Sequence, residues 1–171
     1  MKADELRALQ SPLKEKYRIE PAAAVVTLHA ESRMAEGIAC RIETRQALAE
    51  AGLHPATGGD GSQLCSGDML LEALAACAGV TLQAVSTAMG IHLNDFTVRA
   101  EGMLDFRGTL GVSKEVPVGF RKLELTFALE TDAEEASIQK LIELTERYCV
   151  VFQTLKNPPA IFISKSPLPL T

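Results

Sequence analysis

Apolar residues recur at helical spacing through residues 68–89, the strongest periodic segment of the chain. Positions three and four apart form two neighbouring stripes. The first holds Leu70, Leu74, Cys77, Thr81 and Val85, and the second holds Leu71, Ala75, Ala78 and Leu82. Because such a helix is apolar on most of its faces, we expect it to be central rather than to lie on the surface. Ser66 is a plausible N-cap, Asp68 favours the positive end of the helix dipole, and Gly90 is a plausible stop.

Alternation of apolar and polar residues predicts half-buried strands on both sides of a glycine-rich turn at residues 108–119. The first is centred on residues 96–100 and the second on residues 123–129. Nearer the N-terminus, residues 24–30 and 37–44 predict a hairpin joined by a polar turn at residues 32–36.

A second helix is predicted to begin near Thr131, where Thr131 and Glu134 have the spacing of a capping box. Its apolar positions run toward Leu155, Asn157-Pro158-Pro159 stops it, and residues 161–164 predict a last strand. Cys149 lies inside this helix or restarts it.

The remaining segments have weaker signals. Residues 3–16 predict a short helix interrupted by Pro12, either an arm on a partner subunit or a frayed end. Residues 46–51 predict one or two helical turns before a loop of glycine and small polar residues. The order of elements predicts an α+β fold with helices on a sheet. We therefore expect an N-terminal extension over residues 1–23 and one domain over residues 24–171.

Composition narrows the function classes. The chain has 171 residues, 47% of them hydrophobic and 23% charged, as in an ordinary globular protein. A net charge of −5 without a basic run argues against nucleic-acid binding. The charged N-terminus is not a secretory signal, and polar residues interrupt the apolar stretch at 69–89, so we expect no membrane span and a cytoplasmic location.

The chain has four cysteines, Cys40, Cys65, Cys77 and Cys149, at wide and uneven spacing. They do not have the pattern of a disulfide framework. Because there is no CxxC and the three histidines lack ligand spacing, we expect no metal. Any one of these cysteines is, by default, a buried small hydrophobe.

For Cys77 and Cys149, the segments around them favour a functional role instead. These segments are SGDMLLEALAACAGVTL (residues 66–82), which holds Cys77, and ERYCVVFQTL (residues 146–155), which holds Cys149. Together and in this order they resemble the paired cysteine helices of the OsmC/Ohr family, the osmotically inducible protein C and organic hydroperoxide resistance proteins. The resemblance covers about residues 24–165. It implies an OsmC-like fold, with antiparallel sheets packed on two long helices, in an intertwined homodimer.

The resemblance also implies a chemistry. Family members characterised as enzymes reduce organic hydroperoxides with two cysteines and no cofactor. Cys77 is then the thiol that attacks the peroxide and becomes a sulfenic acid, and Cys149 is the thiol that resolves it to a disulfide. A dithiol reductant regenerates the pair.

A thiol in an apolar helix needs help to ionise. In the family an arginine supplies it, oriented by a carboxylate ten residues before the first cysteine, where this chain has Gly67. Asp68 follows one place later, about 13 Å from Cys77 along a straight helix. Candidates for the cation are Arg33, Arg41 and Arg45, with His54 as a weak substitute.

Other interpretations stay open. Asp68 also suits a helix-dipole role, and Arg41 and Arg45 also suit solvent-facing strand positions. Cys65 is a bystander or an alternative disulfide partner, and Cys40 is most simply a core residue. Tyr148 and Phe152 are packing residues or the lining of an apolar pocket. The competing functions are a non-peroxidatic protein that binds a small apolar ligand at a dimer interface, and a purely structural role for the cysteines.

Overall fold

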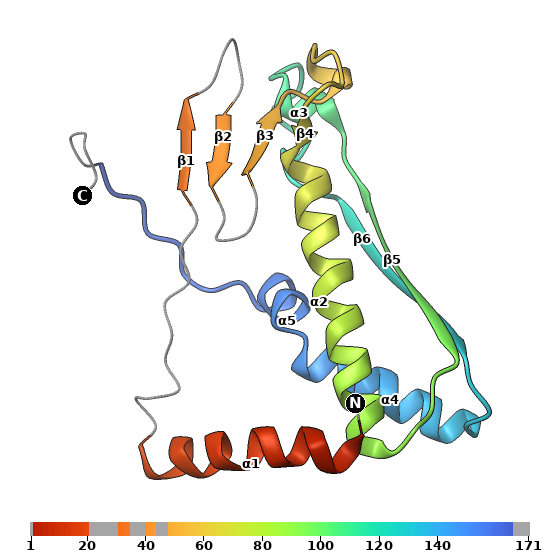
Figure 1. Ribbon diagram of the computed structural model, residues 1–171. Helices are drawn as coiled ribbons and strands as arrows, with labels where there is room; N and C mark the ends of the chain where they lie inside the picture. Colours follow the sequence, from red (N-terminus) through yellow and green to blue (C-terminus); the bar gives the residue numbers. More distant parts are fainter. Residues whose placement is uncertain (1, 21–30, 35–39, 44–47, 166–171) are drawn as a thin grey trace.

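One long helix organises the molecule (Figure 1). The computed structural model describes residues 2–20, 31–34, 40–43 and 48–165. The central helix is α2 (Ser66–Met89), and a hairpin of β5 (Asp95–Met103) and β6 (Lys122–Glu130) lies along one side of it. The helices α4 (Glu135–Tyr148) and α5 (Val150–Lys156) pack on the same helix. Helices on small sheets make this an α+β fold, as predicted.

The ends of α2 follow from local chemistry. Gly90 has a left-handed backbone, with φ of 72°, and its N–H donates to the carbonyls of Ser86 and Thr87. A residue without a side chain tolerates this conformation best, so the helix stops where predicted. The N-cap differs from the prediction by one residue. Cys65 has the extended backbone of the cap, and Ser66 is already the first helical residue.

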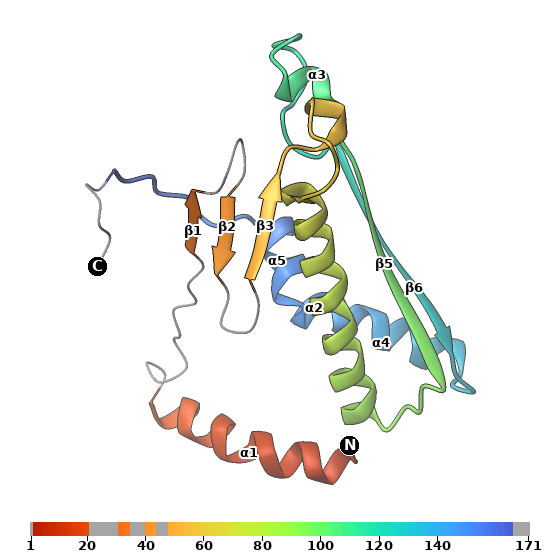
Figure 2. The same ribbon diagram turned by 45° about the horizontal axis from the view of Figure 1, so that its top comes forward.

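Every second residue is partly buried along β6 and along the first six residues of β5, as the alternating sequence predicts. The two strands pair antiparallel along their whole length, from Asp95 opposite Glu130 to Met103 opposite Lys122. Figure 2 shows the hairpin running the length of α2. Its inner face packs on that helix, so the hairpin and α2 form two layers.

The core lies between the C-terminal half of α2, the hairpin and α4. Its buried centre is Leu82, Val85 and Leu141. Eight partly buried side chains surround this centre: Met89, Ile91, Leu93, Phe96, Val98, Phe127, Leu129 and Leu144. Burying a side chain of this size contributes about 1.5–3 kcal/mol, so this cluster holds the two layers together.

A second sheet of four strands lies on the other side of α2 (Figure 1). Its strands are β1 (Glu31–Met34), β2 (Cys40–Glu43), β3 (Leu48–Gly52) and β4 (Leu64–Cys65), in that order. The first three pair antiparallel, as do β5 and β6, whereas the two-residue strand β4 pairs parallel to β3.

Two predictions in this region are wrong. The polar segment 32–36 was expected to be a turn, yet β1 occupies residues 31–34 and pairs with β2. Residues 48–52 form β3 rather than helical turns, because pairing on both edges overrides a weak helical preference. The expected strand at residues 24–30 lies outside the described residues.

The helical segments also differ in their bounds. The N-terminal helix α1 (Ala3–Ile19) continues across Pro12 instead of being interrupted there, and it packs against α2. The helix α4 begins four residues after Thr131, and its N-cap is Glu134. The Thr131 hydroxyl donates to the His92 carbonyl (2.6 Å) and accepts from the Ala133 N–H (3.2 Å), so its hydrogen bonds lie ahead of the helix. Residues 161–164 form no strand. Two short elements, the 3-10 helix η2 (Pro55–Thr57) and α3 (Phe106–Thr109), complete the fold.

Among the helices of the described residues, only α2 is long and apolar enough to cross a membrane. Core helices of many proteins have the same length and composition, so this property alone is weak evidence for a membrane span. Here one face of α2 packs on the hairpin and another on α4 and α5.

Candidate functional site

Cys77 and Cys149 come together at the crossing of α2 with the α4–α5 pair. Cys77 lies in the middle of α2 and is half-buried, whereas Cys149 is fully buried. Both are free thiols, and the two side chains interact with each other. The predicted pair is therefore brought together by the tertiary structure, although 72 positions separate the two residues in sequence.

Cys149 lies at a break between two helices, and this break builds the site. Its N–H donates to the Thr145 carbonyl (2.9 Å) as the last bond of α4, and its own carbonyl accepts from the Gln153 N–H (2.9 Å) as the first bond of α5. Between them the backbone is extended, with φ of −72° and ψ of 110°. The second helix was predicted to run on or restart at this residue, and it restarts.

The break exposes backbone N–H groups of the first turn of α5 to Cys77. Burial by itself raises the pKa of the Cys77 thiol. The Val151 N–H, the Cys149 thiol, the Val150 N–H and the Thr81 hydroxyl act in the opposite direction, and together they hold the pKa of Cys77 below its ordinary value. A helix start carries partial positive charge, so a thiolate is stabilised there without a charged side chain.

The pKa of Cys149 is shifted in the opposite direction. Burial is the main cause and raises it, and the neighbouring Cys77 raises it further. The N–H groups of Phe152 and Val151 oppose this only in part. Of the two thiols, Cys77 therefore ionises first, while Cys149 stays protonated beside it.

An apolar groove of about 220 Å³ lies one helical turn from the two thiols, neither of which lines it. Leu74 is one helical turn before Cys77, and Phe152 is one turn after Cys149. The groove is lined by Leu74, Leu123, Leu125, Phe152, Leu155 and Lys156. Of the two aromatic residues considered from sequence, Phe152 lines this groove, whereas the Tyr148 ring is 58% exposed.

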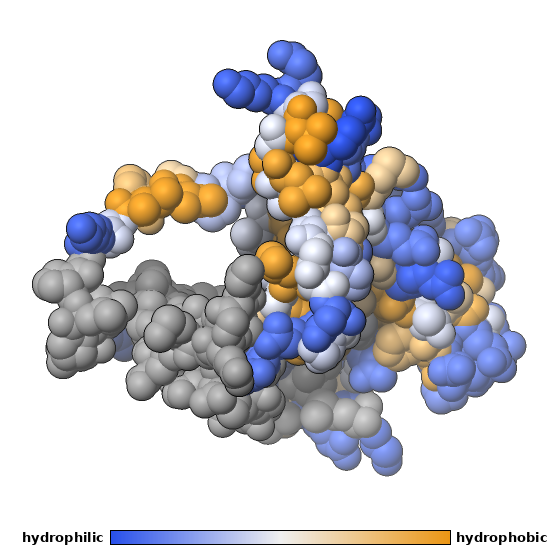
Figure 3. All heavy atoms as spheres, turned by 90° about the horizontal axis from the view of Figure 1, so that it is seen from above, coloured by the Kyte–Doolittle hydropathy of each residue, from blue (hydrophilic) through white to orange (hydrophobic). Residues whose placement is uncertain are grey.

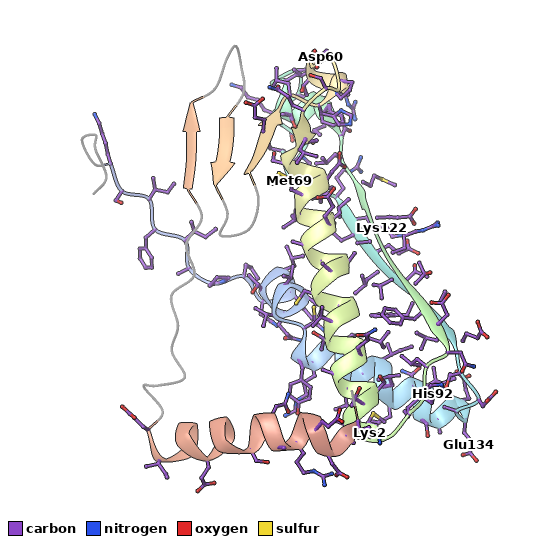
Figure 4. The ribbon with its side chains drawn as sticks, in the orientation of Figure 1. Lys2, Asp60, Met69, His92, Lys122 and Glu134 are labelled. Carbon is purple, nitrogen blue, oxygen red and sulfur yellow. The ribbon has the colours of Figure 1, made fainter. Side chains whose placement is uncertain are left out.

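Asp68 lies elsewhere on α2, in its first turn and exposed. It borders a cavity of about 330 Å³ together with Cys65, His54 and two phenylalanines. His54 is half-buried there rather than exposed, and its ring stacks on Phe106 with centroids 4.7 Å apart. Figure 4 shows this end of the molecule around Met69 and Asp60, with His92 and Glu134 at the opposite end. Within one chain, then, Asp68 is on the same helix as Cys77 but nine residues away.

The side chains of the arginines predicted as candidate cations lie outside the described part of the structure. Arg41 lies in β2, opposite Arg33 of β1 and Glu50 of β3, but its side chain is outside the described part of the structure. Arg45 lies wholly outside it, and so does the side chain of Cys40. Their roles remain predictions.

In the described ranges, no group of three or more histidine, cysteine or acidic side chains is arranged to hold a metal ion.

Sequence reasoning missed the backbone groups that act on Cys77. Val150 and Val151 contribute N–H groups, and these look the same in every non-proline residue. The signal that does exist is Thr81, which lies one turn after Cys77 on the same stripe and donates to the Cys77 carbonyl (2.7 Å).

The model of the OsmC-like protein family matches residues 59–164, which is more than half of the chain. An OsmC-like protein from Mycoplasma pneumoniae has the same fold, with a TM-score of 0.66 and 17% identity over 78% of this chain and 89% of that one. An organic hydroperoxide resistance protein from Elizabethkingia anophelis is similar, with a TM-score of 0.64 and 15% identity over 79% and 91%. So is an OsmC-like protein of unknown function from Vibrio cholerae, with a TM-score of 0.60 and 11% identity over 76% and 94%. Among curated proteins, no sequence matches.

The fold and the family match define the class: the chain belongs to the OsmC-like protein family. The structural relatives include organic hydroperoxide resistance proteins. At these low identities the likeness establishes the fold, and the activity has to be argued from the site.

Proposed function

We propose that this protein is a thiol-dependent peroxidase that reduces organic hydroperoxides through Cys77 and Cys149. The observation that carries the proposal is the meeting of two free thiols at the helix break, one half-buried and the other fully buried. The half-buried thiol ionises more readily than a free cysteine, and the buried one stays protonated. A nucleophile and a resolving thiol need this difference.

In the first step the Cys77 thiolate attacks the terminal oxygen of the hydroperoxide ROOH. An S–O bond forms, the O–O bond breaks, and the alkoxide takes a proton and leaves as the alcohol ROH. Cys77 becomes a sulfenic acid. The N–H groups of Val150 and Val151 stabilise the thiolate before the attack.

In the second step Cys149 attacks the Cys77 sulfur, which forms the disulfide and releases the hydroxyl as water. The buried thiol is already in contact with its target, so this step requires little movement. A dithiol reductant then returns both cysteines to thiols by two exchanges and becomes a disulfide itself. A cytoplasmic location would supply such a reductant.

The groove beside the thiols favours a substrate with an apolar body. Its lining is aliphatic and aromatic apart from Lys156, so an alkyl chain is bound there better than water or hydrogen peroxide.

The direct test is the mass of the intact protein, without reductant, before and after one equivalent of an organic hydroperoxide such as cumene hydroperoxide. We expect loss of two hydrogens, mapped by peptide analysis to a Cys77–Cys149 link and absent in Cys77→Ser. An unchanged mass over minutes would falsify the peroxidase proposal.

The same groove also supports a second candidate, a protein that binds a small apolar ligand without peroxide chemistry. It is favoured by the absence, among the described side chains, of a charged group acting on Cys77. The two functions separate in a Cys77→Ser, Cys149→Ser double variant. A binding protein retains ligand affinity there, and its wild type consumes no peroxide.

We further propose that the functional unit is a homodimer. Only 28% of the apolar window of α2 is buried within one chain, and Val80 on this helix is 72% exposed. After the last helix, Ile161, Phe162 and Ile163 are 83–96% exposed. Figure 3 shows this segment as a hydrophobic projection away from the body. Apolar surface of this extent is normally covered by a partner.

Sedimentation equilibrium tests the dimer. The expected mass is twice 18.4 kDa, and Val80→Lys, which places a charge on the exposed face, is expected to shift the protein toward monomer. Thr126→Lys, on the polar outer face of β6, is the matched control and should leave the dimer intact. A monomeric wild type contradicts this proposal.

A further inference from the structure

The carbonyl of Glu146 lies in the last turn of α4, where the helical hydrogen bonds stop. In an uninterrupted helix it accepts from the N–H four residues ahead, that of Val150. This bond is absent, because α4 ends at Tyr148 and Cys149 has an extended backbone. The Val150 N–H acts on Cys77 instead. The break therefore leaves one carbonyl in need of another donor.

Gln153 supplies that donor. Its side-chain Nε2 donates to the Glu146 carbonyl at 2.8 Å, across the break and from a part-buried position. Its Oε1 accepts from Asn157 Nδ2 at 3.2 Å. An amide nitrogen only donates and an amide oxygen only accepts, so these two partners determine which end of the amide faces the carbonyl.

We propose that Gln153 is a positioning residue for the Cys77–Cys149 site. Its side-chain amide takes the place of the Val150 N–H at the Glu146 carbonyl, and so keeps that N–H directed at Cys77. The catalytic consequence rests on the proposed function, but the geometric claim concerns the thiol alone.

Without this amide the Glu146 carbonyl needs another donor. An unpaired carbonyl at a part-buried helix end is unfavourable, and the nearest available donor is the Val150 N–H. Taking it back extends α4 toward α5 and removes a donor from Cys77. Gln153 is not among the groups that shift the pKa of Cys77 most, so its expected effect on the thiol passes through the backbone.

Few titratable groups surround Cys77. Those on the packed elements are Cys149 at the break, Glu72 on α2, and Glu146, Arg147, Tyr148 and Lys156 on the α4–α5 pair. On the hairpin, the charged side chains of β5 and β6 are on its exposed face. Among these described groups, Cys149 is the one that acts on the Cys77 thiol. A change in the titration of Cys77 therefore reports on Cys149 and the backbone donors.

The test is the pH profile of Cys77 alkylation by iodoacetamide in the full-length reduced protein, followed by peptide mapping between pH 6 and pH 11. Gln153→Glu retains the size of the side chain and its acceptor for Asn157, but at these pH values it cannot donate to the Glu146 carbonyl. We expect the half-point of the profile to move upward by up to one unit, so that the rate at pH 7 falls by up to about tenfold. The rate at the alkaline plateau should remain within about two-fold, because the accessibility of the sulfur is unchanged.

Two further variants separate the mechanism from simple damage. Gln153→Met removes the donor without adding a charge and should shift the profile in the same direction. Thr154→Val is the matched control: its hydroxyl donates to the Val150 carbonyl (2.8 Å) on the exposed side of the same helix, and the profile should stay as in the wild type. Asn157→Ala, at an exposed position, loosens the same amide and should give a smaller shift.

A profile of Gln153→Met that coincides with the wild type overturns the proposal, even if Gln153→Glu fails to fold. An equal loss of rate at every pH also overturns it, because that pattern indicates altered access rather than an altered thiolate. The readout needs no peroxide. Failure of the wild type to consume hydroperoxide therefore refutes the proposed function and leaves this inference to be judged on the alkylation data.

Discussion

Cys65, at the N-cap of α2, and Cys77, in the middle of that helix, have different surroundings, although both are half-buried. Cys65 is the N-cap residue of the helix and borders a cavity together with the imidazole of His54 and the carboxylate of Asp68. Cys77 lies in the apolar middle of the helix, and its described surroundings include no charged side chain that acts on it.

Cys77 has a lowered pKa and a second thiol beside it. Two of the groups that lower this pKa are backbone N–H groups of α5, a separate helix that packs against α2. The surroundings of Cys77 therefore depend on backbone groups brought by another element, and not only on residues near it in sequence.

Serine substitutions of Cys77 and Cys65 are expected to give the largest difference in hydroperoxide consumption between these two sites. Cys77→Ser should lower hydroperoxide consumption by roughly a thousand-fold or more, because a hydroxyl is a far poorer nucleophile than a thiolate. Cys65→Ser should remain within about two-fold of the wild type. Steady-state turnover with a dithiol reductant measures both. Equal losses in the two variants would remove the distinction between the sites.

Cys149→Ser should divide the reaction into its two steps. We expect a single burst of alcohol product, because Cys77 still attacks the peroxide, and then almost no turnover with a dithiol reductant of low concentration. Dimedone, which labels sulfenic acids, should modify Cys77 in this variant and not in the wild type. A full turnover rate without Cys149 would show that it does not resolve the sulfenic acid.

Val150→Pro tests the backbone donor itself. Proline fits the first position of a helix and lacks an N–H, so the substitution removes one of the groups that act on Cys77 with little cost to α5. The rate of Cys77 alkylation at pH 7 is expected to fall by about five- to tenfold, corresponding to a rise of its pKa by up to one unit. Val150→Ala, which retains the N–H, is the control and should match the wild type.

The two thiols of the site should titrate in opposite directions from a free cysteine. Alkylation requires the thiolate, whose fraction rises as the pH rises through the pKa. Since the pKa of Cys77 is lowered and that of Cys149 raised, Cys77 should reach its half-maximal rate at a lower pH than Cys149. Mass mapping of both peptides from one pH series measures this. The reverse order would contradict the assigned roles.

The smallest effect is expected for Asp68→Asn. Asp68 is exposed in the first turn of α2, nine residues before Cys77, so we expect mainly the loss of a favourable interaction with the helix dipole, about 0.3–1 kcal/mol of stability. Turnover should stay within about two-fold. A tenfold loss of turnover would mean that this carboxylate reaches the thiol of a second copy of the chain.

Strong periodicity accounts for most of what could be predicted. The helix at residues 66–89 and the strands around residues 96–100 and 123–129 each present one apolar face, and each forms within a few residues of its expected bounds. The family resemblance rests on the same segments, and the match over residues 59–164 confirms it.

Where the periodicity of the sequence is weak, hydrogen bonds to distant parts of the chain determine the local structure. Residues 48–52 read as a short helix but lie between β2 and β4, and hydrogen bonds on both edges outweigh a small propensity difference. Thr131 has the spacing of a helix cap, but its hydroxyl donates to the carbonyl of His92, 39 residues away in sequence, and accepts from the Ala133 N–H before the helix begins. No local rule includes a partner so distant.

The sequence by itself determined the α+β class and the central apolar helix, because both depend on residue types at regular spacing. It singled out Cys77 and Cys149 as a candidate pair through the family resemblance. Only the tertiary structure decided how the surroundings of Cys77 and Cys149 differ. The helix break at Cys149 directs two N–H groups at Cys77 and buries the second thiol beside it. Backbone amides are the same in nearly every residue, so their direction is set by the fold and not by the amino-acid type.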